Sequence, residues 1–381
     1  MKFCVFSSDP LFKYYEKGEI KPRYWNPLNI FDEVYVFSFC QEDVAAEKVR
    51  TLVGEARLEI IPIGSPNALR LHQQYRRALG ELARIKPDLV RVHNPWHAGL
   101  VGISAARKLN IPVLLSLHTH YQARRQWEKR WLLQVLRLAE YYSMRRADCV
   151  LCVSHYLTGY ARSMGARRIE VIYNRVYADK FHCRRRAPEG RPIILSVGRL
   201  DPPKDQECLI RALVGLEVDL HLVSDGINRP RLEELVVELG LHDSVQFFGP
   251  VPQAEIQVHY ARAFIFAMAT HYEGFCMPIL EAMAAGLPVV ASATDPIPEI
   301  LGGRGWTVET NPAAFREVFE ELLRRPQKAL AMGEQARERA LELDGSLMER
   351  KEAELYCSLM GVDLADGRAD MGVEAPVARL Q

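Results

Sequence analysis

Two glutamates lie eight residues apart in the stretch HYEGFCMPILEAMAAGLPVVAS, which spans residues 271–292. An apolar helical pattern begins near Met277, so Glu281 is expected about one turn inside a helix and Glu273 in the loop before it. The two carboxylates therefore cannot form an acid–base pair on one helix face, but they can hold the two ends of a single ligand. For Glu281 taken alone, an exposed residue on a capped helix is the competing interpretation.

The residues between these glutamates offer backbone N–H groups at the start of a helix, where anions bind. Four residues contribute these groups: Gly274, Phe275, Cys276 and Met277. A nucleotide sugar matches this arrangement, because it carries hydroxyl groups at both ends and a diphosphate between them. The stretch therefore predicts a nucleotide-sugar site.

These residues need a scaffold, and short β-branched runs alternate with longer amphipathic runs almost throughout the chain. Such alternation is typical of βαβ units and parallel sheets. Strands are expected near residues 2–7, 33–39, 58–63, 89–93, 113–118, 149–153 and 169–173, and again near 193–198, 220–224, 245–248, 264–268, 289–292 and 306–308. The predicted fold class is α/β, with two doubly wound, Rossmann-like domains that face each other across a cleft.

The chain has 381 residues, more than one hydrophobic core usually serves, so two domains are expected. A basic cluster and a Pro-Glu-Gly turn interrupt the periodicity in FHCRRRAPEGRP, residues 181–192, which we interpret as the linker. The domains then cover residues 1–180 and 181–345. Residues 346–362 are expected to form a helix that packs back on the first domain, and residues 363–381 to form a mobile tail.

The order of motifs in the second half resembles that of glycosyltransferase family 4, whose members are retaining enzymes of the two-domain GT-B fold. The resemblance rests on EGFCMPILEAMAAGLPVVAS followed by PEI at 298–300, SVGRLDPPKD at 196–205, VSDGINRPRLEELVVELGL at 223–241 and VQFFGPVP at 245–252. In the first half it is carried by RVHNPWHAG, LLSLHTHY and CVSHY. It implies an enzyme that transfers a sugar from a nucleoside-diphosphate sugar to an acceptor hydroxyl, with acceptor and donor on the first and second domains respectively.

The resemblance also implies roles for individual residues of the donor side. Arg199 and Lys204 correspond to the pair that binds the donor diphosphate, where fixed cations stabilise the departing negative charge. Gly198 lets the backbone approach the donor closely. By the same correspondence Glu273 meets the hydroxyls of the donor sugar and Glu281 the ribose. The backbone at Val251 is expected beside the base.

Histidines in the first half raise the question of a metal. His118 ends an apolar strand, and the resemblance places it beside the donor sugar, whereas His120 is expected to be structural. His93 and His97 lie in a loop with no carboxylate at ligand spacing, which argues against a metal site. Enzymes of this family replace a metal with cationic side chains and a helix dipole, so no cofactor is expected.

Three departures from the family pattern concern the cleft. Cys276 stands where the family usually has glycine, and Arg175 follows an asparagine where glycine is common, at the predicted hinge. The usual glycine pair of the first strand-to-helix loop is replaced by an aromatic and basic segment, residues 7–27. Because that loop faces the acceptor in this fold, the identity of the acceptor cannot be taken from better-known members.

Charge is unevenly distributed along the chain. Residues 1–180 carry 28 Lys or Arg against 17 Asp or Glu, and residues 181–381 carry 21 against 31. Residues 121–147 concentrate seven basic residues, among them Arg124, Arg125, Lys129 and Arg130. As a helix this segment would place Trp127, Trp131 and Val135 on one stripe, which is typical of an interfacial helix on an anionic membrane. A core-facing helix with a solvated basic side and a soluble anionic acceptor are the alternatives.

These observations limit the partners and the location. No apolar run is long enough to span a bilayer, and the N-terminus shows no secretory signal, so a cytoplasmic protein is expected, peripheral on the inner face of the membrane if the basic segment binds lipid. The acceptor is expected to be a glycan, a lipid-linked molecule or a small molecule, and no nucleic-acid-binding module is recognisable. A nucleotide-sugar epimerase of the same form and a non-catalytic donor-binding subunit are the alternative functions.

Overall fold

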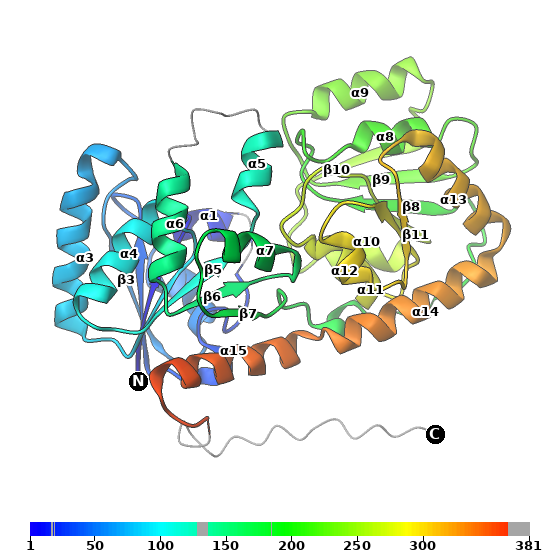
Figure 1. Cartoon of the computed structure of the whole chain (residues 1–381). Coiled ribbons are helices and arrows are strands. Elements are labelled where there is room, and N and C mark those ends of the chain that lie inside the picture. The colour runs from blue at the N-terminus through cyan, green and yellow to red at the C-terminus, as the bar shows by residue number, and fades with distance from the viewer. Residues whose placement is uncertain (17, 19, 128–135, 184, 365–381) are drawn as a thin grey trace.

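The fold is known from a computed structural model that describes residues 1–364 except 17, 19, 128–135 and 184. It contains two parallel sheets, each flanked by helices (Figure 1). The seven strands of the first sheet, in the order β3-β2-β1-β4-β5-β6-β7, are β1 (Lys2–Phe6), β2 (Glu33–Ser38), β3 (Arg57–Pro62), β4 (Leu89–Val92), β5 (Val113–Leu117), β6 (Cys149–Cys152) and β7 (Ile169–Val171). The six strands of the second, in the order β10-β9-β8-β11-β12-β13, are β8 (Ile193–Val197), β9 (Asp219–Val223), β10 (Val245–Gly249), β11 (Ile265–Met268), β12 (Val289–Ser292) and β13 (Trp306–Val308). The predicted strands are confirmed to within two residues at each end.

Helices connect these strands and cover both faces of each sheet. The N-terminal domain has α1 (Leu11–Glu16), α2 (Ala46–Val49), α3 (Leu71–Ile85), α4 (His97–Lys108), α5 (Tyr121–Trp127), α6 (Leu136–Arg146) and α7 (Tyr156–Ser163), with short 3-10 turns η1 (Pro27–Asn29), η2 (Arg50–Val53) and η3 (Ala68–Arg70). The 3-10 turn η5 (Ala178–Phe181) lies at the junction and contacts helices of the C-terminal half. The C-terminal half has α8 (Gln206–Ala212), α9 (Arg229–Glu238), α10 (Ile256–Arg262), α11 (Met277–Ala284), α12 (Ile297–Leu301), α13 (Pro312–Arg324), α14 (Pro326–Glu342) and α15 (Gly345–Met360).

Buried side chains alternate between two cores on the faces of the first sheet. Cys149 of β6 packs in the core that contains Phe3, whereas Cys152 packs in the other core with Phe6. The two thiols therefore lie on opposite faces, as expected from the odd spacing on a strand.

Both sheets reverse their strand order beside their first strand, between β1 and β4 and between β8 and β11. In open parallel sheets ligands bind at the carboxyl ends of the strands next to such a reversal. The fold thus directs both carboxyl edges toward the space between the domains.

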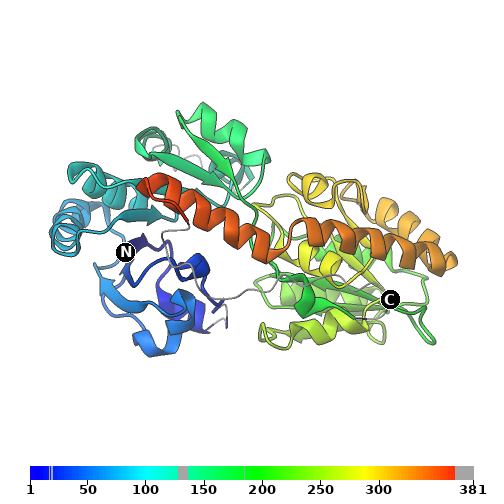
Figure 2. The same ribbon diagram turned by 90° about the horizontal axis from the view of Figure 1, so that it is seen from below.

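The last two helices run along one side of the molecule and join the domains (Figure 2). α14 packs on α11 of the second domain, and α15 crosses to the first domain, where it covers β4 and η1. A buried polar network fixes α15 there, because Glu352 accepts hydrogen bonds from both Arg91 and Arg175. Arg175 is the residue that replaces the expected glycine, and its side chain also donates to the Arg23 carbonyl at 3.0 Å.

The segment interpreted as a linker is held against the second domain. Arg185 donates hydrogen bonds to the carbonyl oxygens of Ala285 at 2.7 Å, Ala263 at 2.8 Å and Tyr260 at 2.8 Å. Burial lowers the pKa of this guanidinium. In this connection, movement between the domains would therefore have to occur on the N-terminal side of Arg185, and the second connection, between α14 and α15, would have to bend as well.

The basic segment differs from its predicted form at one position. Arg125 was expected on a charged surface, but its side chain is 2% exposed and forms an ion pair with the fully buried Glu140. Trp96 Nε1 donates to the same carboxylate at 2.8 Å, so Arg125 balances a buried charge instead of facing solvent. Lys129, Arg130, Trp131 and Val135, like the predicted tail from residue 365 onward, lie outside the described residues. In the described part of the chain, every helix is too short or too polar to cross a bilayer.

Candidate functional site

A cleft of about 950 Å³ lies between the two domains, at the carboxyl edge of the second sheet. Tyr14, Lys21 and Tyr24 of the N-terminal domain line one side of it. Of the residues predicted for the donor, the opposite wall includes Gly198, Arg199, Val251, Met277 and Glu281. The side chains of four other predicted residues do not line this cleft because they are buried or paired in the supporting loops: Lys204, Glu273, Phe275 and Cys276. Gly274 lies in the same loop and packs against the first domain.

The lysine and the glutamate of the predicted donor site are bound to each other. Lys204 Nζ donates to Glu273 Oε1, and the two side chains are only 17% and 8% exposed. Burial alone would disfavour the charge on the lysine, but the adjacent Glu273 carboxylate raises the pKa of Lys204 above its ordinary value. Lys204 is therefore charged at neutral pH, and the pair holds the loop before α11 against the loop after β8.

Arg199 is placed differently from Lys204, since its side chain is 74% exposed at the cleft. It forms an ion pair with Asp201, a residue that the sequence motif contains but that was not predicted for the site. Gly198 precedes it at the end of β8. A Cβ there would stand 3.6 Å from Met268 Cε and 3.8 Å from Lys204 Cε, which are ordinary contacts, so the need for glycine comes from its backbone conformation, with φ 158°, which residues with a side chain rarely adopt.

Glu281 lies in α11 and is 7% exposed, which rules out the interpretation of an exposed helix residue. Tyr260 Oη donates to its Oε2 at 2.8 Å and Gln253 Nε2 to its Oε1 at 3.2 Å. Both partners were missed in the sequence. Gln253 directly follows the GPVP motif, which could have indicated it, whereas nothing local distinguishes Tyr260 from any other buried aromatic residue.

The loop before α11 packs directly against the first domain. A Cβ on Gly274 would lie 2.1 Å from the His118 carbonyl oxygen, so only glycine fits there. Cys276 adopts a left-handed conformation, with φ 52° and ψ 73°, at the N-cap of α11. This explains why glycine is usual at that position, since a Cβ there costs about 1 kcal/mol or more. Burial raises the pKa of the Cys276 thiol to about 12, so the side chain is a neutral thiol.

His118 ends β5 and stacks on His93, with ring centroids 5.5 Å apart and planes 6° apart. The Nε2 atoms of both rings are buried and have no hydrogen-bond partner among the described residues. Burial, aided by the nearby Arg91 and opposed by Glu352, lowers the pKa of His118 to about 4. His118 is therefore a neutral imidazole with an unsatisfied nitrogen beside the cleft. His120 instead packs on Tyr160, with ring centroids 4.2 Å apart.

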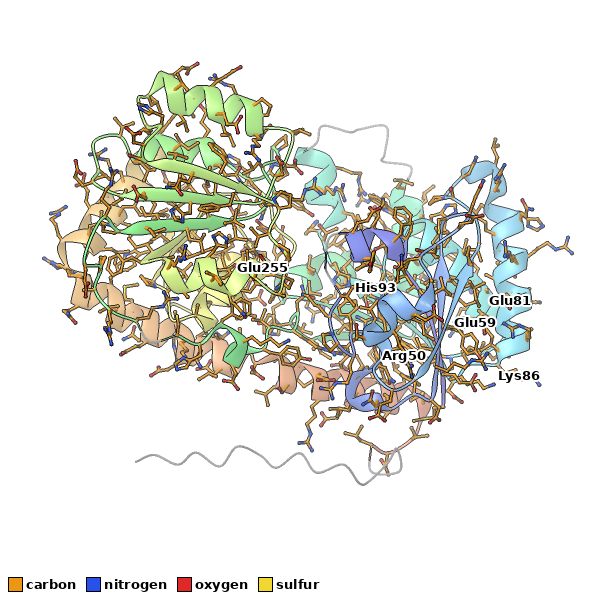
Figure 3. The ribbon with its side chains drawn as sticks, turned by 180° about the vertical axis from the view of Figure 1, so that it is seen from behind. Arg50, Glu59, Glu81, Lys86, His93 and Glu255 are labelled. Atoms are coloured by element: carbon orange, nitrogen blue, oxygen red, sulfur yellow. The ribbon has the colours of Figure 1, made fainter. Side chains whose placement is uncertain are left out.

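A second cavity, of about 410 Å³, opens on the N-terminal side of His118. Four of its ten lining residues belong to the segment 7–27: Ser8, Asp9, Tyr14 and Tyr24. The others follow β4 and β5, namely His93, Asn94, Trp96, His118, Tyr121 and Arg124. Figure 3 shows His93 on the inner side of this domain, far from Glu81 and Lys86 on the outer helix α3. Asn94 and Trp96 were missed, although they directly follow a predicted strand end.

Glu299 of the PEI stretch connects the domains. Its carboxylate accepts hydrogen bonds from the backbone N–H groups of His155 at 2.7 Å and Tyr156 at 2.9 Å, at the start of α7. It also accepts from Tyr173 Oη at 2.8 Å. A carboxylate at a helix N-terminus is favourable both as a cap and toward the helix dipole. Among the described residues, no three His, Cys, Asp or Glu side chains form a group that could hold a metal ion.

Comparisons with known proteins agree with this geometry. Residues 178–339 match the family described as Glycosyl transferases group 1, and residues 32–180 match Glycosyltransferase Family 4. A GDP-mannose-dependent alpha-(1-6)-phosphatidylinositol monomannoside mannosyltransferase of Mycolicibacterium smegmatis is 30% identical over 328 residues, which are 79% of this chain and 76% of that protein. A sulfoquinovosyl transferase of Arabidopsis thaliana is 28% identical over 242 residues, 59% of this chain and 46% of that protein.

Solved structures share the fold at lower identity. Sucrose-phosphate synthase from Thermosynechococcus elongatus superposes with a TM-score of 0.78 at 21% identity, covering 95% of this chain and 99% of the other. The Anabaena protein HepE, in complex with UDP and glucose, gives a TM-score of 0.76 at 21% identity, with 94% and 100% covered. At this identity the likeness establishes the arrangement of the two domains and nothing more.

Proposed function

This chain belongs to the family 4 glycosyltransferases, and we propose that it transfers a sugar from a nucleoside-diphosphate sugar to an acceptor hydroxyl with retention of configuration. One observation carries the proposal. His118 lines the N-terminal cavity and also a space of about 150 Å³ that shares Lys21, Tyr24 and Met277 with the donor cleft, so a donor and an acceptor could be bound on the two sides of one unsatisfied imidazole. An epimerase would not need the second cavity, which favours transfer.

The donor is proposed to lie along the second sheet. Arg199 and Lys204 would hold the diphosphate, because each has N–H donors beyond the one given to its carboxylate partner. The second carboxylate oxygen of Glu273 would accept from a hydroxyl of the donor sugar. Glu281, fixed by Tyr260 and Gln253, would accept from the ribose, with the base near Val251.

The reaction proposed for this arrangement forms and breaks bonds on one face of the sugar. The bond between the anomeric carbon and the diphosphate oxygen breaks while the acceptor oxygen bonds to the same carbon. The acceptor proton passes to the departing diphosphate, whose charge the two cations stabilise. His118 and Glu273 would hold the sugar as positive charge grows at the anomeric carbon. With His118 neutral, neither residue has to act as a general base, and no metal ion or cofactor is part of the proposal.

The acceptor is proposed to occupy the 410 Å³ cavity. Tyr14, Tyr24, Trp96 and Tyr121 offer aromatic faces, while Asp9 offers a carboxylate at the rim. Aromatic faces with a few polar groups suit a sugar ring, so a glycan or a glycosylated lipid is the favoured acceptor. The phosphatidylinositol monomannoside in the name of the Mycolicibacterium relative is of that class. A lipid-linked acceptor would bring the enzyme to the inner face of an anionic membrane, as the basic N-terminal domain suggests.

The donor can be tested first by thermal shift with GDP, UDP, ADP and their sugars. A ligand at a hundred times its dissociation constant stabilises the protein by about 2.7 kcal/mol, so the preferred base should be evident. Incubation of that donor with mannosylated and glucosylated acceptors, followed by mass spectrometry, then distinguishes the functions. A glycosylated acceptor supports transfer, a donor altered in the absence of acceptor indicates epimerisation, and binding without either product indicates a non-catalytic subunit.

A further inference from the structure

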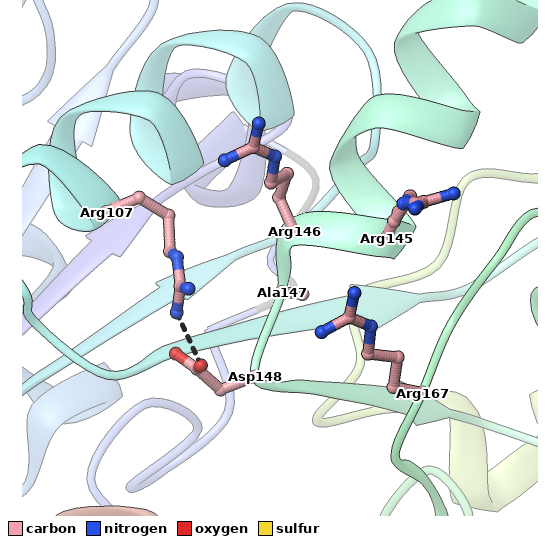
Figure 4. Close-up of a pocket in the computed structure, with 6 residues that line it drawn as sticks. All are labelled: Arg107, Arg145, Arg146, Ala147, Asp148 and Arg167. Carbon is pink, nitrogen blue, oxygen red and sulfur yellow. Dashed lines mark hydrogen bonds and ion pairs between the residues drawn. The ribbon is translucent and has the colours of Figure 1, made fainter.

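Another cavity, rich in arginine and about 320 Å³ in volume, lies in the N-terminal domain far from the cleft and from the cavity beside His118. It is lined by Arg107, Arg145, Arg146, Ala147, Asp148 and Arg167, and Figure 4 shows the four arginines arranged around Ala147. These residues lie at the ends of α4 and α6 and directly before β6 and β7. They therefore occupy the amino edge of the parallel sheet, opposite the carboxyl edge that faces the donor.

The charges in this cavity are not balanced. Its single carboxylate, Asp148, accepts from Arg107 Nη1 at 2.7 Å and from the Val113 backbone N–H at 2.9 Å. Within the described ranges no ion pair reaches Arg145, Arg146 or Arg167. One arginine is thus neutralised and three positive charges remain around the same space.

Two of these three arginines are held in position by aromatic rings. The Arg145 guanidinium lies over the Tyr141 ring and that of Arg146 over the Tyr142 ring, each 5.7 Å from the centroid. Tyr142 is itself hydrogen-bonded to Ser104 at 2.9 Å. Stacking uses the face of a guanidinium, and Arg145 also donates one N–H to Tyr141 Oη at 2.5 Å, so most of each N–H edge remains for an anion.

Part of this cluster has a local explanation. Arg107, Arg145 and Arg146 lie in the last turns of α4 and α6, where basic residues interact favourably with the helix dipole. Arg167 does not, because it lies after the end of α7, two residues before β7 begins at Ile169. It adds a further positive charge beside the other three; these side chains are exposed, so the repulsion is screened by water, but the space between them attracts an anion.

We propose that this cavity binds a phosphoryl group with a charge of about −2, as found in a phosphomonoester or a diphosphate. The planar fork of a guanidinium matches phosphate oxygens in two parallel hydrogen bonds, and several such forks converge here. The site is separate from the donor cleft and does not rest on the proposed transferase function. Its phosphate could come from a soluble molecule or from a lipid headgroup, and these sources share one chemistry.

Inorganic pyrophosphate is the probe, measured by isothermal titration calorimetry. Because the donor cleft is also proposed to bind diphosphate, the titrations use Arg199→Ala protein. Adding Arg145→Gln and Arg167→Gln should weaken binding at least about tenfold. Adding Arg324→Gln and Arg325→Gln instead, which removes the same charge from residues that are 73% and 69% exposed on the second domain, should leave binding unchanged.

Two results would overturn the site: no binding by the Arg199→Ala protein below about 1 mM, or equal weakening by both pairs of substitutions. If the double substitution of Arg145 and Arg167 lowers the unfolding temperature, the single variant Arg167→Gln is used in its place, since no described ion pair depends on Arg167. The Arg324→Gln/Arg325→Gln protein remains the control.

Vesicles distinguish the two sources of phosphate. Wild type, the Arg145→Gln/Arg167→Gln variant and the Arg324→Gln/Arg325→Gln control are sedimented with phosphatidylcholine vesicles with or without phosphatidic acid. If vesicles with phosphatidic acid capture the wild type and the control but not the Arg145→Gln/Arg167→Gln variant, the site binds a lipid headgroup. Pyrophosphate binding that depends on the site, without such capture, assigns it to a soluble phosphate. If neither ligand responds selectively to Arg145 and Arg167, the proposal is wrong.

Discussion

Removing the Glu299 carboxylate should uncouple the two domains. Glu299→Ala deletes the hydrogen bonds to His155 N, Tyr156 N and Tyr173 Oη. A lost helix cap costs about 1 kcal/mol, and the hydrogen bond to the partly buried tyrosine contributes about another 1 kcal/mol. The contact between the domains is then weaker by about 2 kcal/mol, which is roughly a 30-fold change in the ratio of closed to open molecules.

Steady-state kinetics with the donor found by thermal shift would measure this effect. Because the contact is absent when the domains separate, kcat/KM should fall by up to about 30-fold in Glu299→Ala. Glu299→Gln should fall less, since its one oxygen can still accept one backbone N–H. Small-angle X-ray scattering of the unliganded variants should show a larger radius of gyration than the wild type. Neither the fall in kcat/KM nor the larger radius of gyration is expected if contacts other than those of Glu299 hold the two domains together.

Glu338→Ala is the matched control. Its carboxylate is 69% exposed and pairs with Arg304 at 3.4 Å within the second domain, so it contributes little. A double-mutant cycle with Tyr173→Phe separates the tyrosine bond from the helix cap. Wild-type kcat/KM and an unchanged radius of gyration in Glu299→Ala would refute the idea that this residue couples the domains.

Three further predictions concern the cleft. Arg199→Ala should remove most turnover and leave the unfolding temperature unchanged, whereas Lys204→Ala should lower turnover and also reduce the free energy of unfolding by about 3 kcal/mol, because it leaves the buried Glu273 unpaired. Kinetics and thermal unfolding of the two variants check this, and near-normal rates in both would contradict the diphosphate assignment. The folded-state pKa of His118, about 4, lies below its ordinary value of about 6.5, so between these pH values the unfolded chain binds more protons than the folded protein. The free energy of unfolding must therefore fall as the pH is lowered through this window. His118→Gln should lose less stability than the wild type between pH 7 and pH 5, and an equal loss would show that the ring is not buried in its neutral form. NMR of the first-formed product should show the configuration of the donor sugar retained, and an inverted product would contradict the same-face reaction. Activity should be the same with and without a chelator, and activity lost on chelation would contradict a metal-free reaction.

Much of the donor side could be predicted from the sequence, because its signals are local. The motif around Gly198 and the start of α11 at Met277 follow from strand ends, turns and apolar periodicity within a few residues. The sequence showed that Cys276 stands in a glycine position, but its left-handed conformation became evident only in the structure. The roles assigned to these residues stay predictions until a donor complex or kinetics tests them.

Contacts between distant segments could not be predicted in the same way. Lys204 and Glu273 are 69 residues apart and Glu299 and His155 are 144 apart, and nothing in either local pattern says that the side chains meet. Arg125 was taken for a surface residue because its segment is basic, yet Glu140 binds it inside the domain.

The sequence by itself determined the two parallel sheets, the order of strands and helices along the chain, and the family. The sheets and the order of elements follow from the period of the apolar residues and from the turns, which depend on neighbours in the chain, and the family follows from the resemblance of the motifs. The tertiary structure decided which charges are paired, that Gly274 touches the His118 carbonyl, and that four arginines converge at the far edge of the first sheet. Such contacts depend on how complete surfaces pack against each other, and the free energy of a charge is set by its surroundings in space and not by its neighbours in the chain.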